Sequence, residues 1–216
     1  MIKLIILDFD GVIIESANIK HEAFIEIFQD YDDVLDDIIQ YLIQNKAISR
    51  FDKFKYIYEN FIGGEYNSQI EKELGDKFSE IIFQKIIEAP FVKGAEEFLE
   101  YFYKRYPIYI ASNTPQKELE EIIEKRNLNK YFKQIFGRPP GTKIEFIKEI
   151  LKHENAQPNE AVYIGDMIED YKIAKKLNVL FIGRKNLESF EDFNIPQSSD
   201  LLGIKKLLIN ILIEHK

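Results

Sequence analysis

The sequence contains no cysteine and no tryptophan among its 216 residues. Without cysteine the chain can form no disulfide bond, and both thiolate nucleophiles and cysteine-bound metals are excluded. The lack of cysteine is typical of proteins that work in a reducing compartment. We therefore expect a cytoplasmic protein.

Positive charge and long apolar runs are also scarce. The chain has 29 Lys and Arg against 37 Asp and Glu, which gives a formal net charge of -8. A basic surface for nucleic acid is therefore not expected. No apolar run reaches the roughly 20 residues of a membrane span, and the N-terminus lacks the pattern of a signal peptide. We expect no nucleic-acid or membrane partner, and the sequence leaves the oligomeric state open.

Short apolar runs alternate with helix-period segments along much of the chain. The runs are rich in Ile, Val, Tyr and Phe, as buried strands are, and they cover residues 2–7, 108–111, 134–136, 161–164 and 179–182. Amphipathic helical spacing covers residues 94–104, 115–126, 143–153 and 170–177. This alternation predicts an α/β fold with a Rossmann-like parallel sheet core and right-handed helical crossovers.

The segment between the first two predicted strands is much longer than a crossover requires. It contains helical patterns and no convincing strand, whereas a parallel connection needs only about a dozen residues. We therefore predict an inserted α-helical subdomain at residues 17–88, with the sheet-bearing core formed by residues 1–16 and 89–216. A further amphipathic helix is expected in the tail that starts at Ser198.

Two carboxylates, Asp8 and Asp10, end the first apolar run with only Phe9 between them. Side chains two residues apart on a strand point the same way, so both can reach one pocket at the carboxyl edge of the sheet. Like charges this close repel, and burial adds to the cost of ionisation. A bound Mg²⁺, which prefers oxygen ligands, would offset that cost and is the cofactor we expect.

Polar side chains also follow the next three predicted strands. Because parallel strands end at one edge of their sheet, these side chains should meet the first two carboxylates there. Mg²⁺ bound to Asp8, Asp10 and Asp166 would leave room for a phosphate oxygen. The polar residues are Ser112 and Asn113 in "IASNT", Lys143 at the end of "GRPPGTK", and Asp166 and Asp170 in "GDMIED".

In order and spacing, these segments resemble the four motifs of the haloacid dehalogenase superfamily. The first motif corresponds to "DFDGV", and the helical insertion after it is similar to the type 1 cap of that superfamily. The resemblance covers nearly the whole chain, and four ordered motifs are far more specific than the first motif alone. It implies a phosphatase or a β-phosphoglucomutase-like enzyme that acts on a small phosphorylated substrate.

The resemblance also implies the roles of the first two carboxylates. Asp8 would be the nucleophile, which attacks phosphorus and forms an aspartyl-phosphate. Asp10 would protonate the leaving oxygen and then activate water, and its main-chain carbonyl would bind the metal ion.

Further roles are implied for the later motifs. Ser112 would donate to a phosphoryl oxygen, and Asn113 would bind substrate. Lys143 would balance negative charge on the nucleophile and the phosphate. Asp166 would bind Mg²⁺ directly, and Asp170 would act from outside the set of metal ligands.

Three of these assignments have alternatives. Some relatives carry the motif lysine in a Lys-Pro-x-Pro pattern, which would place Arg138 in the role, whereas the Gly-x-Pro-x-x-x-Lys pattern of "GRPPGTK" favours Lys143. Ser112 is also a suitable N-cap for the helix that follows it. Asp170 could likewise cap the next helix.

The preferred interpretation is a Mg²⁺-dependent phosphatase that hydrolyses a small metabolite through an aspartyl-phosphate. The alternatives are a phosphomutase and a regulatory binding protein on the same fold. "KAISRFDKF" resembles the Gly-x-Ser-Arg segment of β-phosphoglucomutase-like proteins, which implies that Arg50 binds substrate. Against a mutase, Lys20 stands where that group has histidine, and "GDMIED" departs from its Glu-Asp-Ser motif.

Overall fold

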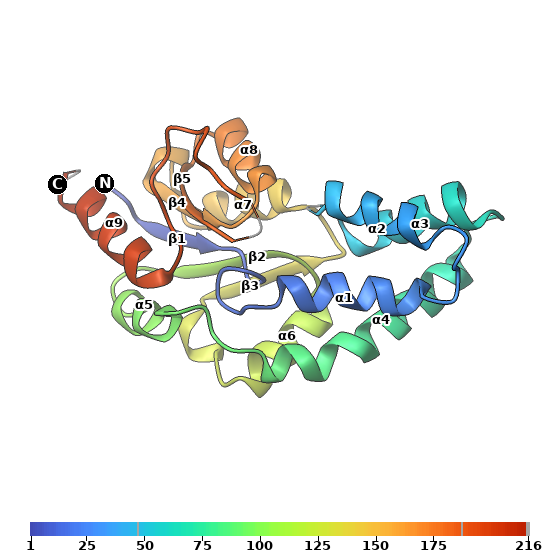
Figure 1. Ribbon diagram of the computed structural model, residues 1–216. Helices are drawn as coiled ribbons and strands as arrows, with labels where there is room; N and C mark the ends of the chain where they lie inside the picture. Colours follow the sequence, from blue (N-terminus) through green and yellow to red (C-terminus); the bar gives the residue numbers. More distant parts are fainter. Residues whose placement is uncertain (47, 187, 215–216) are drawn as a thin grey trace. The chain divides into compact units, whose positions relative to one another are not determined.

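The chain forms two compact units. The computed structural model describes residues 1–46, 48–186 and 188–214. One unit, here called the core unit, contains Met1–Glu15 and Ala89–Lys216, and the other, the helical unit, contains Ser16–Glu88. The two are coloured along the sequence in Figure 1.

Within the described residues, the core unit is built on a six-stranded sheet in which all neighbouring strands are parallel. The strand order is β3-β2-β1-β4-β5-β6, with the fully buried strand β1 near the centre. The predicted α/β fold with a Rossmann-like sheet is therefore confirmed. The strands are β1 (Leu4–Leu7), β2 (Ile108–Pro115), β3 (Gln134–Arg138), β4 (Ala161–Gly165), β5 (Leu180–Arg184) and β6 (Gln197–Ser198).

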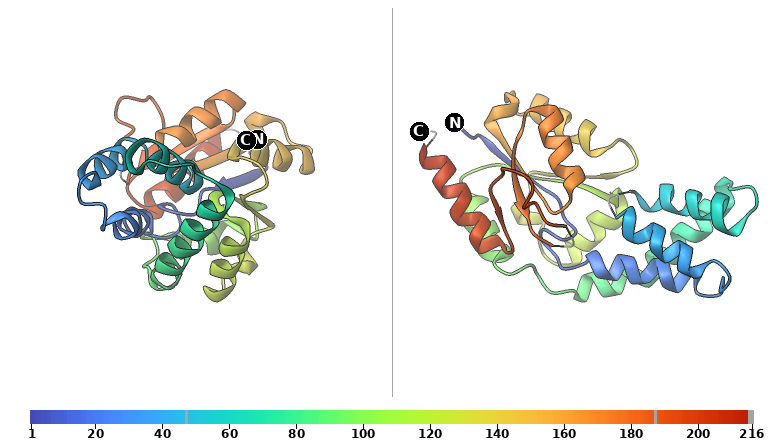
Figure 2. Two further views of the ribbon diagram at one scale, coloured as in Figure 1. Left: turned by 90° about the vertical axis from the view of Figure 1, so that its right-hand side faces the viewer. Right: turned by 45° about the horizontal axis from the view of Figure 1, so that its top comes forward.

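Helices cover both faces of this sheet (Figures 1 and 2). On one face lie α7 (Lys143–His153) and α8 (Ile168–Leu177), whose apolar residues share a buried cluster with the central strands. On the other lie α5 (Ala95–Phe102), α6 (Gln116–Lys125) and α9 (Leu201–Glu214). Short 3₁₀ turns, η2 (Asn129–Tyr131) and η3 (Pro158–Glu160), precede β3 and β4. Burial on both faces explains why the strands are continuous apolar runs.

The strand boundaries differ from the predicted ones by one or two residues at several ends, and there are two larger differences. β2 continues through Ser112 and Asn113 to Pro115, because Pro115 pairs with Arg138 at the end of β3 across an irregular register. The two-residue strand β6 was not predicted. It pairs with β5 at the edge of the sheet, and its polar residues, Gln197 and Ser198, lack the apolar pattern of a buried strand.

The helical unit contains no strand among its described residues. An aromatic cluster fills its interior, with ring centroids of Phe24 lying 5.1 Å from Phe54 and 4.7 Å from Phe78. The predicted helical insertion is confirmed. Its elements are α1 (Ala17–Phe28), α2 (Leu35–Gln44), α3 (Arg50–Ile57), the π-helix η1 (Tyr58–Ile62) and α4 (Ser68–Glu88). Across the described residues of both units, no helix has the length and apolarity required to cross a membrane.

Candidate active site

Asp8 lies directly after β1 and is buried. Its Oδ1 accepts a hydrogen bond of 2.7 Å from the backbone N–H of Phe9, and its Oδ2 faces the ammonium of Lys143. Burial raises the pKa of Asp8 to about 6; the positive charge of Lys143 opposes the rise, and the Asp170 carboxylate adds to it. The nearby ammonium therefore helps a buried carboxylate to stay ionised.

Lys143 is the first residue of α7, whose start is fixed by a capping box between Thr142 and Glu145. Its Nζ donates to Asp8 Oδ2 at 2.8 Å and to Asp170 Oδ1 at 2.7 Å. Burial disfavours the charged amine, but the carboxylates of Asp170 and Asp8 outweigh it and raise the pKa of Lys143 well above its usual value. The side chain is a permanent cation between two anions.

Asp166 and Asp170 follow β4, and both are buried. Asp166 Oδ2 accepts a 3.0 Å hydrogen bond from Asn186 Nδ2. Burial, together with the charges of Asp8 and Asp170, raises the pKa of Asp166 well above its usual value. Asp170 lies in the first turn of α8, where the backbone N–H of Met167 donates to its Oδ2 at 3.3 Å.

Two glycines make room for these carboxylates. Gly11 has φ +73°, and a Cβ at this position would lie 2.0 Å from Asp166 Oδ2. A Cβ at Gly165, the last residue of β4, would lie 2.5 Å from the Cβ of Asp170. Any other residue at either position would force a carboxylate to move.

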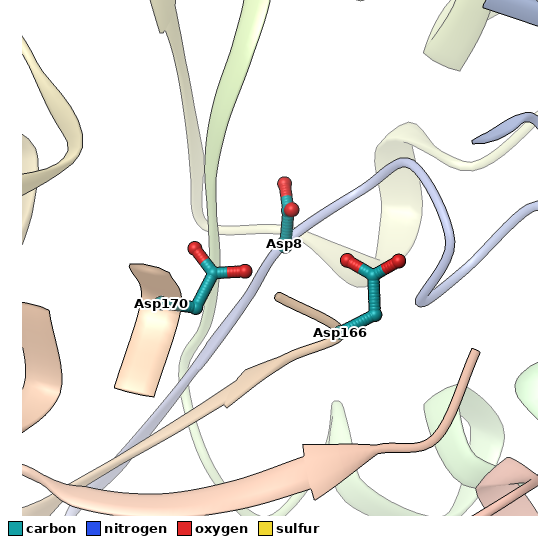
Figure 3. Close-up of side chains that lie close together, drawn as sticks. All are labelled: Asp8, Asp166 and Asp170. Carbon is teal, nitrogen blue, oxygen red and sulfur yellow. The ribbon is translucent and has the colours of Figure 1, made fainter. Parts of the chain in front are cut away.

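The three buried carboxylates point toward one another at the carboxyl edge of the sheet (Figure 3). Asp8, Asp166 and Asp170 each offer one oxygen, and these oxygens lie within 4.8 Å of one another. Lys143 supplies one positive charge against three carboxylates, so a further cation would lower the cost of their burial. A cluster of carboxylate oxygens has the donor chemistry of a hard divalent cation, and the residues fit Mg²⁺.

β2 brings its polar residues to the other carboxylate of the first motif. Thr114 Oγ1 donates to Asp10 Oδ2 at 2.6 Å, and the backbone N–H of Thr114 donates to Ser112 Oγ at 3.0 Å. Ser112 is buried, whereas Asn113 and Asp10 are half-buried. The N-cap of α6 is Pro115, so Ser112 does not cap that helix.

The two arginines considered from the sequence lie in different surroundings. Arg138 is half-buried at the end of β3, whereas the Lys143 side chain is the one in contact with Asp8. Arg50 begins α3 in the helical unit and is only 7% exposed. Its Nη1 donates to Ser79 Oγ at 2.9 Å, and its Cζ lies 4.5 Å from the centroid of the Phe78 ring. Arg50 is thus packed within the interior of the helical unit.

Sequence reasoning assigned no role to three polar side chains that contact the site: Thr114, Tyr163 and Asn186. Thr114 lies two residues after Ser112, a spacing that places side chains on one side of a regular strand. Tyr163 is a phenol in a strand with no exposed residue, and a buried phenol usually has a hydrogen-bond partner. Both signals were readable, whereas Asn186 lies in a loop without a recognisable pattern.

Comparisons with known proteins identify the family and show similar folds. Residues 5–184 match the family model described as "Haloacid dehalogenase-like hydrolase". A curated relative, a phosphorylated carbohydrates phosphatase of Thermotoga maritima, is 22% identical over 181 residues, which is 81% of each chain.

Two solved structures show the likeness of fold. A β-phosphoglucomutase from Clostridium difficile is similar at a TM-score of 0.75 and 18% identity, over 98% of this chain and 100% of that one. A predicted phosphoglycolate phosphatase from Haemophilus somnus is similar at a TM-score of 0.73 and 14% identity, over 96% and 98% of the two chains.

Proposed function

Because the chain belongs to the haloacid dehalogenase-like hydrolase family, we propose that it is a Mg²⁺-dependent phosphatase acting on a small phosphorylated metabolite. One observation carries the proposal: the Lys143 ammonium lies 2.8 Å from Asp8 and 2.7 Å from Asp170 at the carboxyl edge of the sheet. A nucleophilic carboxylate beside a fixed cation suits attack on an anionic phosphoryl group. The likeness to a phosphatase for phosphorylated carbohydrates supports a sugar phosphate as substrate.

In the first step, an Asp8 oxygen attacks phosphorus in line with the leaving oxygen. A bond forms from Asp8 to phosphorus as the bond to the leaving group breaks, which gives an aspartyl-phosphate. Asp10, held by Thr114 through a 2.6 Å hydrogen bond, donates its proton to the leaving oxygen. Lys143 and Ser112 stabilise the negative charge on the phosphoryl oxygens.

In the second step, Asp10 is the general base. Its carboxylate takes a proton from a water molecule, whose oxygen attacks the phosphorus of the aspartyl-phosphate. The bond between Asp8 and phosphorus breaks, which releases inorganic phosphate and restores Asp8 as a carboxylate. The same carboxyl group thus gives and recovers one proton in each cycle.

Asp8, Asp166 and the main-chain carbonyl of Asp10 are the residues proposed to hold Mg²⁺. When bound, the ion supplies positive charge to the phosphoryl oxygens and to the buried carboxylates. Asp170 is proposed to stay outside the ligand set, because its Oδ1 already accepts hydrogen bonds from Lys143 and Tyr163. A cytoplasmic location stays a prediction of the sequence.

A phosphate-release assay tests the proposal. The full chain is assayed with Mg²⁺ on p-nitrophenyl phosphate and on a panel of sugar phosphates, nucleotides, phosphoglycolate and phosphorylated amino acids. We expect phosphate release that excess EDTA removes and that Asp8→Asn abolishes, with the exposed Asp192→Asn as a matched control of normal activity. Full activity in excess EDTA, or in the Asp8→Asn variant, would contradict the proposal. Conversion of a sugar phosphate into its isomer, without phosphate release, would identify a phosphomutase.

A further inference from the structure

Tyr163 is a buried tyrosine beside the candidate site. It lies in β4, in which every residue is buried, and its own exposure is 0%. Its phenol O–H donates a 2.6 Å hydrogen bond to Asp170 Oδ1. Burial and the Asp170 carboxylate keep the pKa of Tyr163 well above its usual value, so the phenol remains a hydrogen-bond donor.

The oxygen that accepts this hydrogen bond also accepts one from Lys143. Asp170 Oδ1 accepts hydrogen bonds from the phenol O–H of Tyr163 at 2.6 Å and from Lys143 Nζ at 2.7 Å. Its other oxygen, Oδ2, accepts a hydrogen bond from the backbone N–H of Met167 at 3.3 Å. Donors on both oxygens restrict the orientation of the carboxylate, and Lys143 is one of these donors.

We propose that Tyr163 is a positioning residue for the reaction: its phenol holds Asp170 so that the Lys143 ammonium stays beside Asp8. The inference rests on the proposed phosphatase function. The phenol of Tyr163 donates to Asp170 and not to the nucleophile Asp8, so in this proposal it acts through the carboxylate of Asp170. Without the phenol, Oδ1 loses the hydrogen bond from Tyr163 and keeps the one from Lys143. The carboxylate and the ammonium can then leave the geometry that phosphoryl transfer requires.

A second tyrosine gives a matched control. Tyr109 in β2 and Tyr163 in β4 both pair with Ile6 of β1, and both are fully buried in the same core cluster. The phenol of Tyr109 donates instead to Glu154, the residue after the end of α7, whereas Lys143 is at its start. A helix of this length separates the two ends by roughly 16 Å. Tyr→Phe at either position deletes one buried hydroxyl, but only one of these hydroxyls faces the site.

The first test is steady-state kinetics on the full chain with Mg²⁺ and the best substrate of the panel. For Tyr163→Phe we expect kcat to fall roughly 10-fold or more. A loss of this size is typical when a partner that orients a metal-binding side chain is removed. KM should stay within about twofold, because the lost positioning acts on the transition state. For Tyr109→Phe, both constants should stay within about twofold. The thermal midpoint of each variant shows that both fold.

The second test needs no activity. A water-soluble amine reagent labels the folded proteins, and mass spectrometry follows Lys143 against the exposed Lys172 as an internal reference. Labelling of Lys143 should be several-fold faster in Tyr163→Phe than in the wild type and unchanged in Tyr109→Phe. If the wild-type protein releases no phosphate from any substrate, the proposed function fails while the labelling still tests the positioning.

Three results would overturn the inference. The first is a Tyr163→Phe variant with wild-type kcat. The second is an equal loss of kcat in Tyr109→Phe, which would show that loss of either buried tyrosine hydroxyl beside Ile6 has the same effect. The third is unchanged labelling of Lys143 in Tyr163→Phe.

Discussion

The two units each bury a lysine, and the two lysines are held in opposite ways. Lys143 in the core unit is 6% exposed and lies between the carboxylates of Asp8 and Asp170. Lys53 in the helical unit is 8% exposed, and its Nζ donates to the backbone oxygen of Lys46 at 3.0 Å. The same Nζ lies 5.2 Å from the centroid of the Phe24 ring.

The opposite pKa shifts of the two side chains show that neighbours decide what burial does. The carboxylates raise the pKa of Lys143 well above its usual value, whereas burial, with the nearby Lys20, lowers the pKa of Lys53 to about 8. Burial and the charges of Lys53 and Lys46 also lower the pKa of His21. The buried cation of the core unit is thus compensated by neighbouring carboxylates, whereas the helical unit holds its buried cation at a cost in stability.

Of the substitutions that compare the two buried lysines, removal of Lys143 should have the largest effect. Lys143→Met leaves Asp8 and Asp170 buried without their counter-charge, so we expect a loss of about 3–5 kcal/mol in the free energy of unfolding without metal. With Mg²⁺ present, kcat should fall on the order of 10²–10³-fold, because the charge that stabilises the phosphoryl group is lost. Urea unfolding and phosphate release measure the two effects. A variant with wild-type kcat would remove Lys143 from the mechanism.

The pH dependence of unfolding should sharpen the comparison. Between about pH 8 and the usual lysine pKa of 10.5 the unfolded chain binds a proton at Lys53 and the folded chain does not. The free energy of unfolding should therefore rise with pH across this window, by up to about 3 kcal/mol from this side chain. The measurement is the difference in urea unfolding between the wild type and Lys53→Met. A difference that stays constant from pH 7 to 10 would contradict the lowered pKa.

At pH 7 the same substitution should stabilise the protein. Lys53→Met removes a buried charge that lies near another cation and supplies a flexible apolar side chain, so we expect a gain of about 1–2 kcal/mol. Lys55→Met is the matched control, because Lys55 lies on the same helix and is exposed. Its effect should stay within about 0.5 kcal/mol. Destabilisation by Lys53→Met would show that the hydrogen bond to Lys46 outweighs the cost of the charge.

The smallest effect is expected from Arg50, where the sequence resemblance predicts substrate binding. Arg50→Ala should raise KM for the best substrate by several-fold and leave KM for p-nitrophenyl phosphate nearly unchanged, because that compound lacks the groups a natural leaving group offers. The contacts of Arg50 with Phe78 and Ser79 give a competing explanation. Equal changes in KM for both substrates, together with lower stability, would assign Arg50 to the packing of the helical unit.

The sheet was predictable because parallel strands that are buried on both faces have continuous apolar sequences. The apolar runs before Asp8 and Asp166 predict two central strands. Because parallel strands end at one edge of their sheet, the polar residues that follow these strands are predicted to lie close together. The short strand β6 could not be predicted, because two polar residues at a sheet edge carry no apolar pattern.

The contacts behind the site were harder to predict. In a strand buried on both faces, the phenol of Tyr163 indicates that a hydrogen-bond partner is needed, but the identity of that partner depends on where α8 places Asp170. The same holds for Arg50, whose burial depends on how α3 packs against Phe78 and Ser79 of α4. Helical spacing predicts that a helix has an apolar face but not which residues of another helix will cover it.

Trapping the phosphoryl group on Asp8 tests the central claim most directly. Without Asp10 as a base, the aspartyl-phosphate should form from p-nitrophenyl phosphate, whose leaving group needs no proton, and should then hydrolyse slowly. Asp10→Asn should give a stoichiometric burst of p-nitrophenol followed by turnover that is roughly 10²–10⁴-fold slower than in the wild type. Mass spectrometry after acid quench should find one phosphoryl group on the peptide that contains Asp8. Turnover without a burst, at a wild-type rate and with no phosphoryl group on Asp8, would contradict the account.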